Sequence, residues 1–231
     1  MPYLAITGAS SGIGYATAKR FYEAGYSVIN LSRRPCDLAG VITITCDLTD
    51  PNFIIHIESD LRASMEDAET ICLVHNAARL AHDTIAEVSA PDLRSVYEIN
   101  LVAPAVLNRT LLPTMNAGSS ILYVGSTLGE KAVPGSFSYV TSKHATIGMM
   151  RASCQDLAGS GVHTACINPG FTDTEMLRDH IPADVMPEIA QMSAYGRLID
   201  PAEIANALFF AAQNPVINGS VINANLGQIE R

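Results

Sequence analysis

Tyr139 and Lys143 stand four residues apart in the segment Tyr-Val-Thr-Ser-Lys, within a stretch whose spacing predicts a helix over about 138–158. Side chains at i and i+4 project from one face of a helix, so the phenol and the ammonium would lie one turn apart. A lysine charge beside a phenol stabilises phenolate and lowers a pKa that starts near about 10, toward the range of proton exchange at neutral pH. The pair could therefore serve as an acid or a base.

A third polar group, Ser126, follows a predicted strand over 120–124 and precedes Tyr139 by thirteen residues. Its hydroxyl could hold a substrate oxygen beside the phenol. A tyrosine and a lysine at this spacing also occur by chance on many helices, as a half-buried ring and a solvated cation. The elements that would position the three groups must decide between these interpretations.

The first of these elements is a glycine turn near the N-terminus. An apolar strand over 3–7 leads into Gly8, Gly12 and Gly14, which open an amphipathic helix. Gly8 would allow a tight turn, Gly12 would let the backbone approach a diphosphate, and Gly14 would let the helix pack closely on the strand. The spacing T-G-x-x-x-G-x-G fits the general dinucleotide fingerprint loosely, and an ordinary glycine-rich turn is the alternative.

The second predicted strand, over 27–31, ends in Ser32, Arg33 and Arg34. An acidic side chain about twenty residues past the glycine turn would accept hydrogen bonds from the ribose hydroxyls of NAD, and none is present there. A guanidinium beside a hydroxyl suits the 2′-phosphate of NADP. The alternative is that the arginines are solvated loop charges, but in an acidic chain their position favours NADP.

The third predicted strand, over 41–46, is followed by Asp47 and Leu48. These two residues could border an adenine ring, with Asp47 accepting from its amino group, or Asp47 could begin an Asx turn. Only residues 33–40 separate this strand from the second. Because a parallel crossover usually needs a dozen residues or more, we expect an abbreviated connection of a single helical turn.

The rest of the chain continues this alternation of strands and helices. Strands are predicted over 70–74, 120–124, 162–167 and 221–223, with helices over 51–65, 90–112 and 138–158 and from 200 onward. The pattern predicts an α/β fold: a single-domain, Rossmann-like, doubly wound, mainly parallel sheet of about seven strands with helices on both faces. We expect one domain over 1–231, with a cofactor half over about 1–125 and a catalytic and substrate half over about 126–231. The irregular segment over about 171–198 reads as a mobile lid.

The amino-acid composition limits the classes of partner that the protein could bind. The 231 residues carry a formal charge of −9, from 14 basic and 23 acidic side chains, which argues against nucleic acid or an anionic membrane surface as a partner. No apolar run is long enough to span a membrane and no targeting segment precedes the first strand, so we expect a cytoplasmic protein. The five cysteines lack metal-ligand spacing and predict neither a metal site nor a disulfide.

Four separated motifs together resemble the single-domain short-chain dehydrogenase/reductase family: the glycine turn, Asn76-Ala77-Ala78, Ser126, and Tyr139-x-x-x-Lys143 followed by Pro169-Gly170. The resemblance implies that Tyr139 is the general acid/base, that Lys143 lowers its pKa and binds the nicotinamide ribose, and that Ser126 anchors the substrate oxygen. It also implies that Asn100 holds a water of the proton relay. From its residue type alone, the Asn100 amide would instead satisfy a local backbone carbonyl.

The same resemblance extends to the cofactor site. Pro169-Gly170 with Thr172 and Thr174 resembles the segment that binds the nicotinamide carboxamide, and Ser32-Arg33 is similar to NADP-preferring members. The residues expected to bind cofactor are Gly8, Ser10, Ser11, Gly12, Ile13, Gly14, Ser32, Arg33, Asp47, Leu48, Asn76, Ala77, Ala78, Tyr139, Lys143, Pro169, Gly170, Thr172 and Thr174. Departures from the family are Ala78 in place of a usual glycine, the short connection over 33–40, and an atypical tail over 223–227.

The leading hypothesis is an NADP(H)-dependent carbonyl reductase or alcohol dehydrogenase acting on a small-molecule carbonyl or alcohol, with NAD less favoured. Other hypotheses are a nucleotide-sensing or scaffolding protein and a compact epimerase or dehydratase. By resemblance we expect a homodimer or homotetramer. An apolar substrate pocket is expected to be lined by Leu128, Val133, Phe137, Phe171 and Met176.

Overall fold

The computed structural model describes residues 1–229 and contains one seven-stranded sheet in which every strand pairing is parallel. The strand order is β3-β2-β1-β4-β5-β6-β7. The strands are β1 (Pro2–Thr7), β2 (Ser27–Ser32), β3 (Ile42–Thr45), β4 (Thr70–His75), β5 (Ser120–Val124), β6 (His163–Pro169) and β7 (Ser220–Ala224). The predicted fold class is therefore confirmed.

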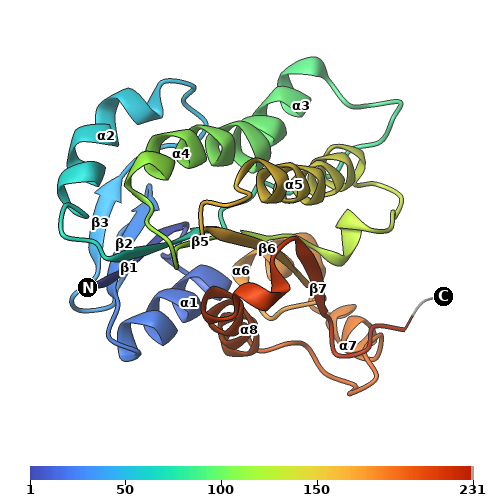
Figure 1. The fold of residues 1–231 in the computed structure, drawn as a ribbon. Coiled ribbons are helices and arrows are strands. Elements are labelled where there is room, and N and C mark those ends of the chain that lie inside the picture. Colours follow the sequence, from blue (N-terminus) through green and yellow to red (C-terminus); the bar gives the residue numbers. More distant parts are fainter. Residues whose placement is uncertain (230–231) are drawn as a thin grey trace.

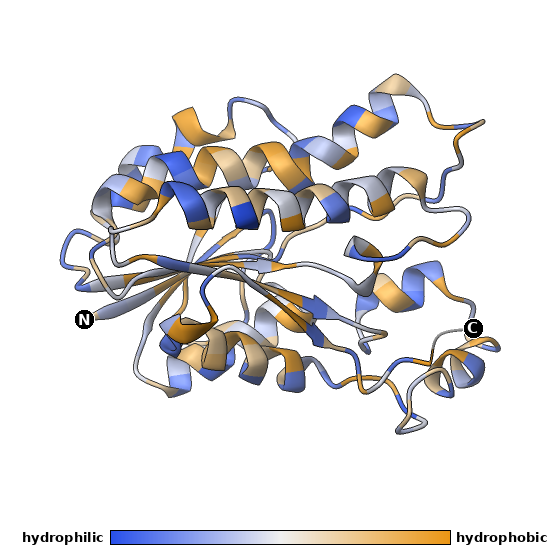
Figure 2. Cartoon of the chain, turned by 45° about the vertical axis from the view of Figure 1, so that its right-hand side comes forward, coloured by the Kyte–Doolittle hydropathy of each residue, from blue (hydrophilic) through white to orange (hydrophobic). Residues whose placement is uncertain are grey.

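Helices cover both faces of this sheet (Figure 1). They are α1 (Gly12–Glu23), α2 (Phe53–Ala63), α3 (Ala90–Tyr97), α4 (Ala103–Leu111), α5 (Phe137–Asp156), α6 (Glu175–His180), α7 (Met186–Ala190) and α8 (Pro201–Gln213). One layer holds α2, α3, α4 and α5, and the other holds α1 and α8; Figure 2 shows the sheet nearly edge-on between them. Because neighbouring strands are parallel, all their carboxyl ends meet at one edge.

Alternating side chains of the strands divide the core into two halves. In β1, Tyr3 and Ala5 pack with α2, α4 and α5, whereas Leu4 and Ile6 pack with α1 and α8. Successive residues of a strand point to opposite faces, so a strand buried on both sides needs a continuous apolar run. This explains why β1 and β4 lack the polar alternation of a half-exposed strand.

The connection between β2 and β3 is abbreviated, as predicted, but it is not helical. Residues 33–40 form bends and a turn, with no helical turn. Side chains of the flanking strands satisfy the loop backbone instead: Asn30 donates from Nδ2 to the Arg34 carbonyl oxygen (3.2 Å), and Thr43 Oγ1 accepts from the Cys36 N–H (3.2 Å). The expected single helical turn was wrong because these side chains replace its hydrogen bonds.

The helix predicted over 90–112 is also not regular. A π-helical segment, Glu98–Val102, interrupts it between α3 and α4 and carries Asn100 in its centre. π-Helical bulges are rare and occur often at functional sites. Asn100 is the buried residue of this π-helical segment, and its contacts are described with the site below.

Candidate active site

A cavity of about 620 Å³ extends along the carboxyl edge of the sheet. Such an edge, beside the point where the chain turns from one side of the sheet to the other, is where doubly wound folds bind ligands. That point lies here between β1 and β4. Of the residues predicted to bind cofactor, all except Gly14 line the cavity, and of the predicted catalytic residues, all except Asn100 do.

The glycine turn has the backbone that its residues allow. Gly8 and Gly12 have φ of +73° and +56°, a region that favours glycine. A Cβ on Gly14 would collide with the Gly8 carbonyl oxygen, so this glycine permits the close approach of α1 to the turn. Asn76 holds the turn in place by donating from Nδ2 to the Thr7 and Gly8 carbonyl oxygens, at 3.0 Å each.

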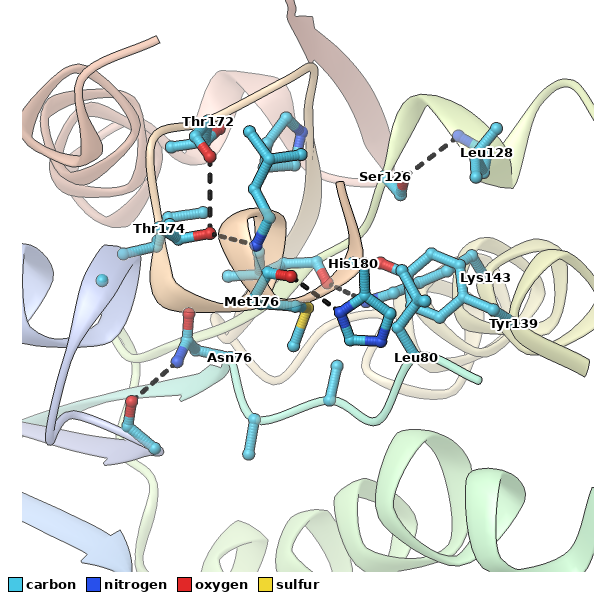
Figure 3. A pocket seen from close by; sticks show the side chains of 18 of the residues that line it. Asn76, Leu80, Ser126, Leu128, Tyr139, Lys143, Thr172, Thr174, Met176 and His180 are labelled. Carbon is cyan, nitrogen blue, oxygen red and sulfur yellow. Dashed lines mark hydrogen bonds between the residues drawn. The ribbon is translucent and has the colours of Figure 1, made fainter. Parts of the chain in front are cut away.

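Tyr139 and Lys143 both lie on α5, are almost completely buried, and line the cavity (Figure 3). The Lys143 ammonium donates to the Val124 carbonyl oxygen (2.8 Å), and its Nζ lies 5.5 Å from the centroid of the Tyr139 ring. An ammonium has three hydrogens, so two remain after this bond. The positive charge is thus positioned by the end of β5 on the phenol's side of the helix.

Ser126 is positioned by the ends of three strands. Its N–H donates to Asn168 Oδ1 (3.2 Å), and Asn168 Nδ2 donates to Asn223 Oδ1 (3.2 Å), which connects β5, β6 and β7. The Ser126 hydroxyl accepts from the Leu128 N–H (3.1 Å). Because a hydroxyl can accept and donate at once, its hydrogen stays available to a substrate oxygen.

Asn100 lies outside the cavity and braces the helix that carries Tyr139. Its Nδ2 donates to the Arg79 carbonyl oxygen (3.1 Å) and to Ser142 Oγ (2.9 Å), and its Oδ1 accepts from the Arg79 N–H (2.8 Å). Ser142 Oγ in turn donates to the Tyr139 carbonyl oxygen (2.8 Å). Both amide hydrogens are used, so the side chain braces α5, in line with the structural alternative, and the relay water stays a prediction.

Asp47 also adopts the structural alternative. Its Oδ1 accepts from the Thr49 N–H (3.0 Å) and hydroxyl (2.8 Å), which is the geometry of an Asx turn. The backbone hydrogen bond from Thr49 is the main reason that the Asp47 pKa lies below its usual value. The carboxylate still lines the cavity, so its turn does not remove it from the site.

The segment predicted as a lid covers one side of the cavity. Thr174 caps α6 by accepting from the Leu177 N–H (3.2 Å), and Met176 and His180 of α6 face the cavity (Figure 3). Phe171, Leu128, Val133 and Met176 line it as predicted, but Phe137 does not. Phe137 is two residues from Tyr139, about 200° around the helix, and therefore faces away.

Several lining residues were not predicted, because no local motif marks them. The rings of His82 and His180 lie 5.0 Å apart between centroids, although 98 positions separate them in the sequence. Other unpredicted lining residues include Leu80, Ile99, Lys131, Glu175, Ile181, Met192, Gln228 and Ile229. Only the fold brings these side chains to one edge.

His75 and four of the five cysteines are buried in the core. His75 is buried and its Nε2 lies 2.7 Å from Asn108 Oδ1, and burial lowers the pKa of His75 to about 4. All five cysteines are free, and burial raises the pKa of Cys72 and of Cys166 to about 12. Because of these shifts His75, Cys72 and Cys166 are neutral at physiological pH, and none of these three residues lines the cavity.

Comparison with known proteins agrees with this arrangement. Residues 3–184 match the family described as short chain dehydrogenase. A cis-4-hydroxycyclohexanecarboxylate dehydrogenase from Sinomonas cyclohexanicum is 32% identical over 228 residues, covering 90% of this chain and 88% of the relative. The chain therefore belongs to the short-chain dehydrogenase family of oxidoreductases, which use nicotinamide cofactors.

Solved structures support the same fold. An angucycline C-6 ketoreductase, LanV, with bound NADP is 26% identical with a TM-score of 0.86, covering 97% of this chain and 95% of that chain. A 4-hydroxyisoleucine dehydrogenase mutant complexed with NADH and succinate is 23% identical with a TM-score of 0.88, covering 98% of each chain. Within the described residues, no helix is both long and apolar enough to cross a bilayer.

Proposed function

We propose that this protein is an NADP(H)-dependent carbonyl reductase or alcohol dehydrogenase. The observation that carries the proposal is that Ser126, Tyr139 and Lys143 line the same cavity as the glycine turn. These side chains come from the end of β5 and from α5, whereas the turn follows β1. Their convergence supports chemistry on a small molecule placed against a nicotinamide.

The cavity fits a dinucleotide. Gly8 and Gly12 leave no side chain between the backbone and an approaching diphosphate, and the start of α1 directs free N–H groups to the same place. At the other end, Pro169, Gly170 and Thr172 line the wall beside Tyr139 and Lys143. When bound, the nicotinamide would supply or accept the hydride.

The chain's own residues would manage the proton and the orientation. The Ser126 hydroxyl would donate to the substrate oxygen, and the Tyr139 hydroxyl would give its proton to that oxygen during reduction, or accept it back through the phenolate during oxidation. Lys143 would stabilise the phenolate with a charge that the Val124 carbonyl holds in place. Asn100 would contribute by positioning α5 through Ser142.

The preference for NADP is proposed from the end of β2. Ser32, Arg33 and Arg34 line the cavity there, and β2 ends without an acidic side chain. Guanidinium and hydroxyl groups suit a 2′-phosphate. One structural neighbour has bound NADP and another is complexed with NADH, so the fold accommodates both.

For the substrate, the lining supports a small or moderately apolar carbonyl compound. Leu80, Leu128, Met176 and Ile181 supply the apolar wall. The relative named above is a dehydrogenase of cis-4-hydroxycyclohexanecarboxylate, and the structural neighbour LanV is an angucycline C-6 ketoreductase. We further propose a homodimer or homotetramer. An apolar groove at the surface of the π-helical segment, α4 and α5, lined by Leu101, Val102, Val106 and Met149 among others, supports a helix-to-helix contact.

The test is a panel of cyclic and linear ketones with NADPH, followed by the loss of NADPH absorbance. We expect oxidation of NADPH with at least one cyclic ketone, and its loss in Ser126→Ala. Binding of NADPH without any oxidation across the panel would contradict the proposal and favour a nucleotide-sensing protein.

A further inference from the structure

Three polar side chains from distant segments meet where the end of β2 faces the glycine turn. Ser11 precedes α1, Arg34 follows β2, and Glu175 is the first residue of α6. The Ser11 hydroxyl donates to Glu175 Oε2 (3.0 Å), and Arg34 Nη2 donates to the same oxygen (3.2 Å) and to Ser11 Oγ (3.3 Å). All three side chains line the cavity.

Arg34 is positioned by the sheet and not by the irregular segment over 171–198 that carries Glu175. The fully buried Asn30 accepts from the Ala9 N–H through Oδ1 (2.9 Å) and donates from Nδ2 to the Arg34 carbonyl oxygen (3.2 Å). One side chain thus fixes both the glycine turn and the backbone of Arg34. Glu175, by contrast, arrives from the irregular segment on the other side of the cavity, and its neighbour Thr174 also lines the cavity, as Figure 3 shows.

The carboxylate of Glu175 lies among donors that a phosphate would use. Hydrogen bonds from Arg34 and then Ser11 hold the pKa of Glu175 below its usual value, so it is an anion at neutral pH. A carboxylate at the ribose end of a dinucleotide site accepts hydrogen bonds from the two ribose hydroxyls of NAD. The same anion would repel the 2′-phosphate of NADP and compete with it for the guanidinium.

We infer that Glu175 determines cofactor discrimination: delivered from α6, it supplies the carboxylate that is absent from the end of β2 and competes with a 2′-phosphate for Arg34 and Ser11. The inference rests on the proposed function only in that the cavity binds a nicotinamide dinucleotide. It modifies the cofactor preference, because Arg34 favours NADP(H) while Glu175 opposes it. The wild-type protein is therefore less selective than its arginines indicate.

The experiment measures binding of NADPH and of NADH by calorimetry to the wild type and to Glu175→Gln, Arg34→Gln and Asp173→Asn. Glu175→Gln keeps the size of the side chain and removes the charge. Asp173→Asn is the matched control, because it removes a carboxylate two residues away that pairs with Arg178 and does not line the cavity. Circular dichroism verifies that the exposed substitutions leave the fold intact.

We expect Glu175→Gln to tighten NADPH about fivefold to tenfold and to leave NADH unchanged or weaker. Arg34→Gln should move the ratio of the two dissociation constants in the opposite direction, and Asp173→Asn should leave it unchanged. Equal effects of Glu175→Gln on both cofactors, weaker NADPH binding, or the same shift in Asp173→Asn would overturn the inference.

This readout is independent of turnover. If Glu175→Gln shifts the ratio while no ketone is reduced, the inference stands and the oxidoreductase proposal fails. If ketones are reduced with NADPH and the ratio does not move, only the role of Glu175 is refuted.

Discussion

Among individual residues, the arginines after β2 carry the proposed preference for NADP. Replacing Arg33 with Ala should weaken NADPH binding by about tenfold or more, because charge-assisted hydrogen bonds to a phosphate are the strong ones, and should change NADH binding little. Calorimetry with both cofactors measures this. Arg62→Ala, which removes a surface arginine paired with Glu58 on α2, is the control. Equal losses for NADPH and NADH would contradict a phosphate contact.

His75 makes the stability of the protein depend on pH. Its pKa is about 4 in the folded state, against about 6.5 for histidine in an unfolded chain. Between these values the unfolded state binds the proton more readily, so the free energy of unfolding falls as the pH drops from about 6.5 to 4, by about 3 kcal/mol. Above pH 6.5 both states are neutral and His75 adds no pH dependence.

The measurement is urea unfolding of the wild type and of His75→Gln between pH 7 and pH 4. Glutamine can still hydrogen-bond to Asn108 but cannot take up the proton. The variant should therefore lose about 3 kcal/mol less than the wild type over this range, with other groups cancelling in the difference. Parallel stability curves would show that His75 is not buried in its neutral form.

At the scale of elements, the glycine turn and α1 form a packed unit in which Gly14 has no room for a side chain. An alanine there would place its Cβ against the Gly8 carbonyl oxygen and Asn76 Nδ2. We expect Gly14→Ala to lower the free energy of unfolding by about 1–3 kcal/mol and to weaken NADPH binding, because the turn must shift.

The matched control is Gly148→Ala in α5. Nothing lies within 4 Å of a Cβ at this exposed position, so alanine should be neutral or stabilise the helix by about 0.5–1 kcal/mol. Thermal and urea unfolding of both variants decides the point. Similar stability of Gly14→Ala and the wild type would contradict the packing argument.

Most helices and strands could be predicted from the sequence because they form for reasons that lie in residues close to one another along the chain. The glycines before α1 and the pairing of Tyr139 with Lys143 depend on residues close in sequence, and an apolar run suffices to place a buried strand. The π-helical interruption depends on bonds from Asn100 to residues 21 and 42 positions away. The loop after β2 depends on side chains of Asn30 and Thr43. No short window of sequence contains the partners of Asn100, whereas those of Asn30 and Thr43 lie four and seven residues away but belong to no motif that marks them.

The same distinction applies to the site. The residues that match family motifs were found from the sequence, whereas Glu175 and the His82–His180 pair come together only through the fold. An acidic residue directly after Thr174 was visible, but its meeting with Ser11, 164 positions away, was not. The prediction that Phe137 lines the pocket was wrong for a simpler reason. Phe137 lies two residues from Tyr139, and this spacing alone places the two side chains on different sides of α5.

At the scale of the whole molecule, segments far apart in the sequence meet at one edge of the sheet. One cavity is lined by residues at the carboxyl ends of strands β1 to β6 and by residues of helices α5 and α6. The proposed chemistry depends on this convergence and, within it, on a buried phenol beside a buried ammonium. A change confined to the phenol hydroxyl should therefore separate chemistry from cofactor binding.

The most direct test compares Tyr139→Phe with the wild type for NADPH binding and for NADPH-dependent ketone reduction, with Tyr22→Phe at the surface as the control. We predict that Tyr139→Phe lowers kcat by about a hundredfold to ten-thousandfold while its dissociation constant for NADPH stays close to that of the wild type. Ketone reduction at the wild-type rate in Tyr139→Phe would contradict the assignment of the proton donor, and with it the proposed mechanism.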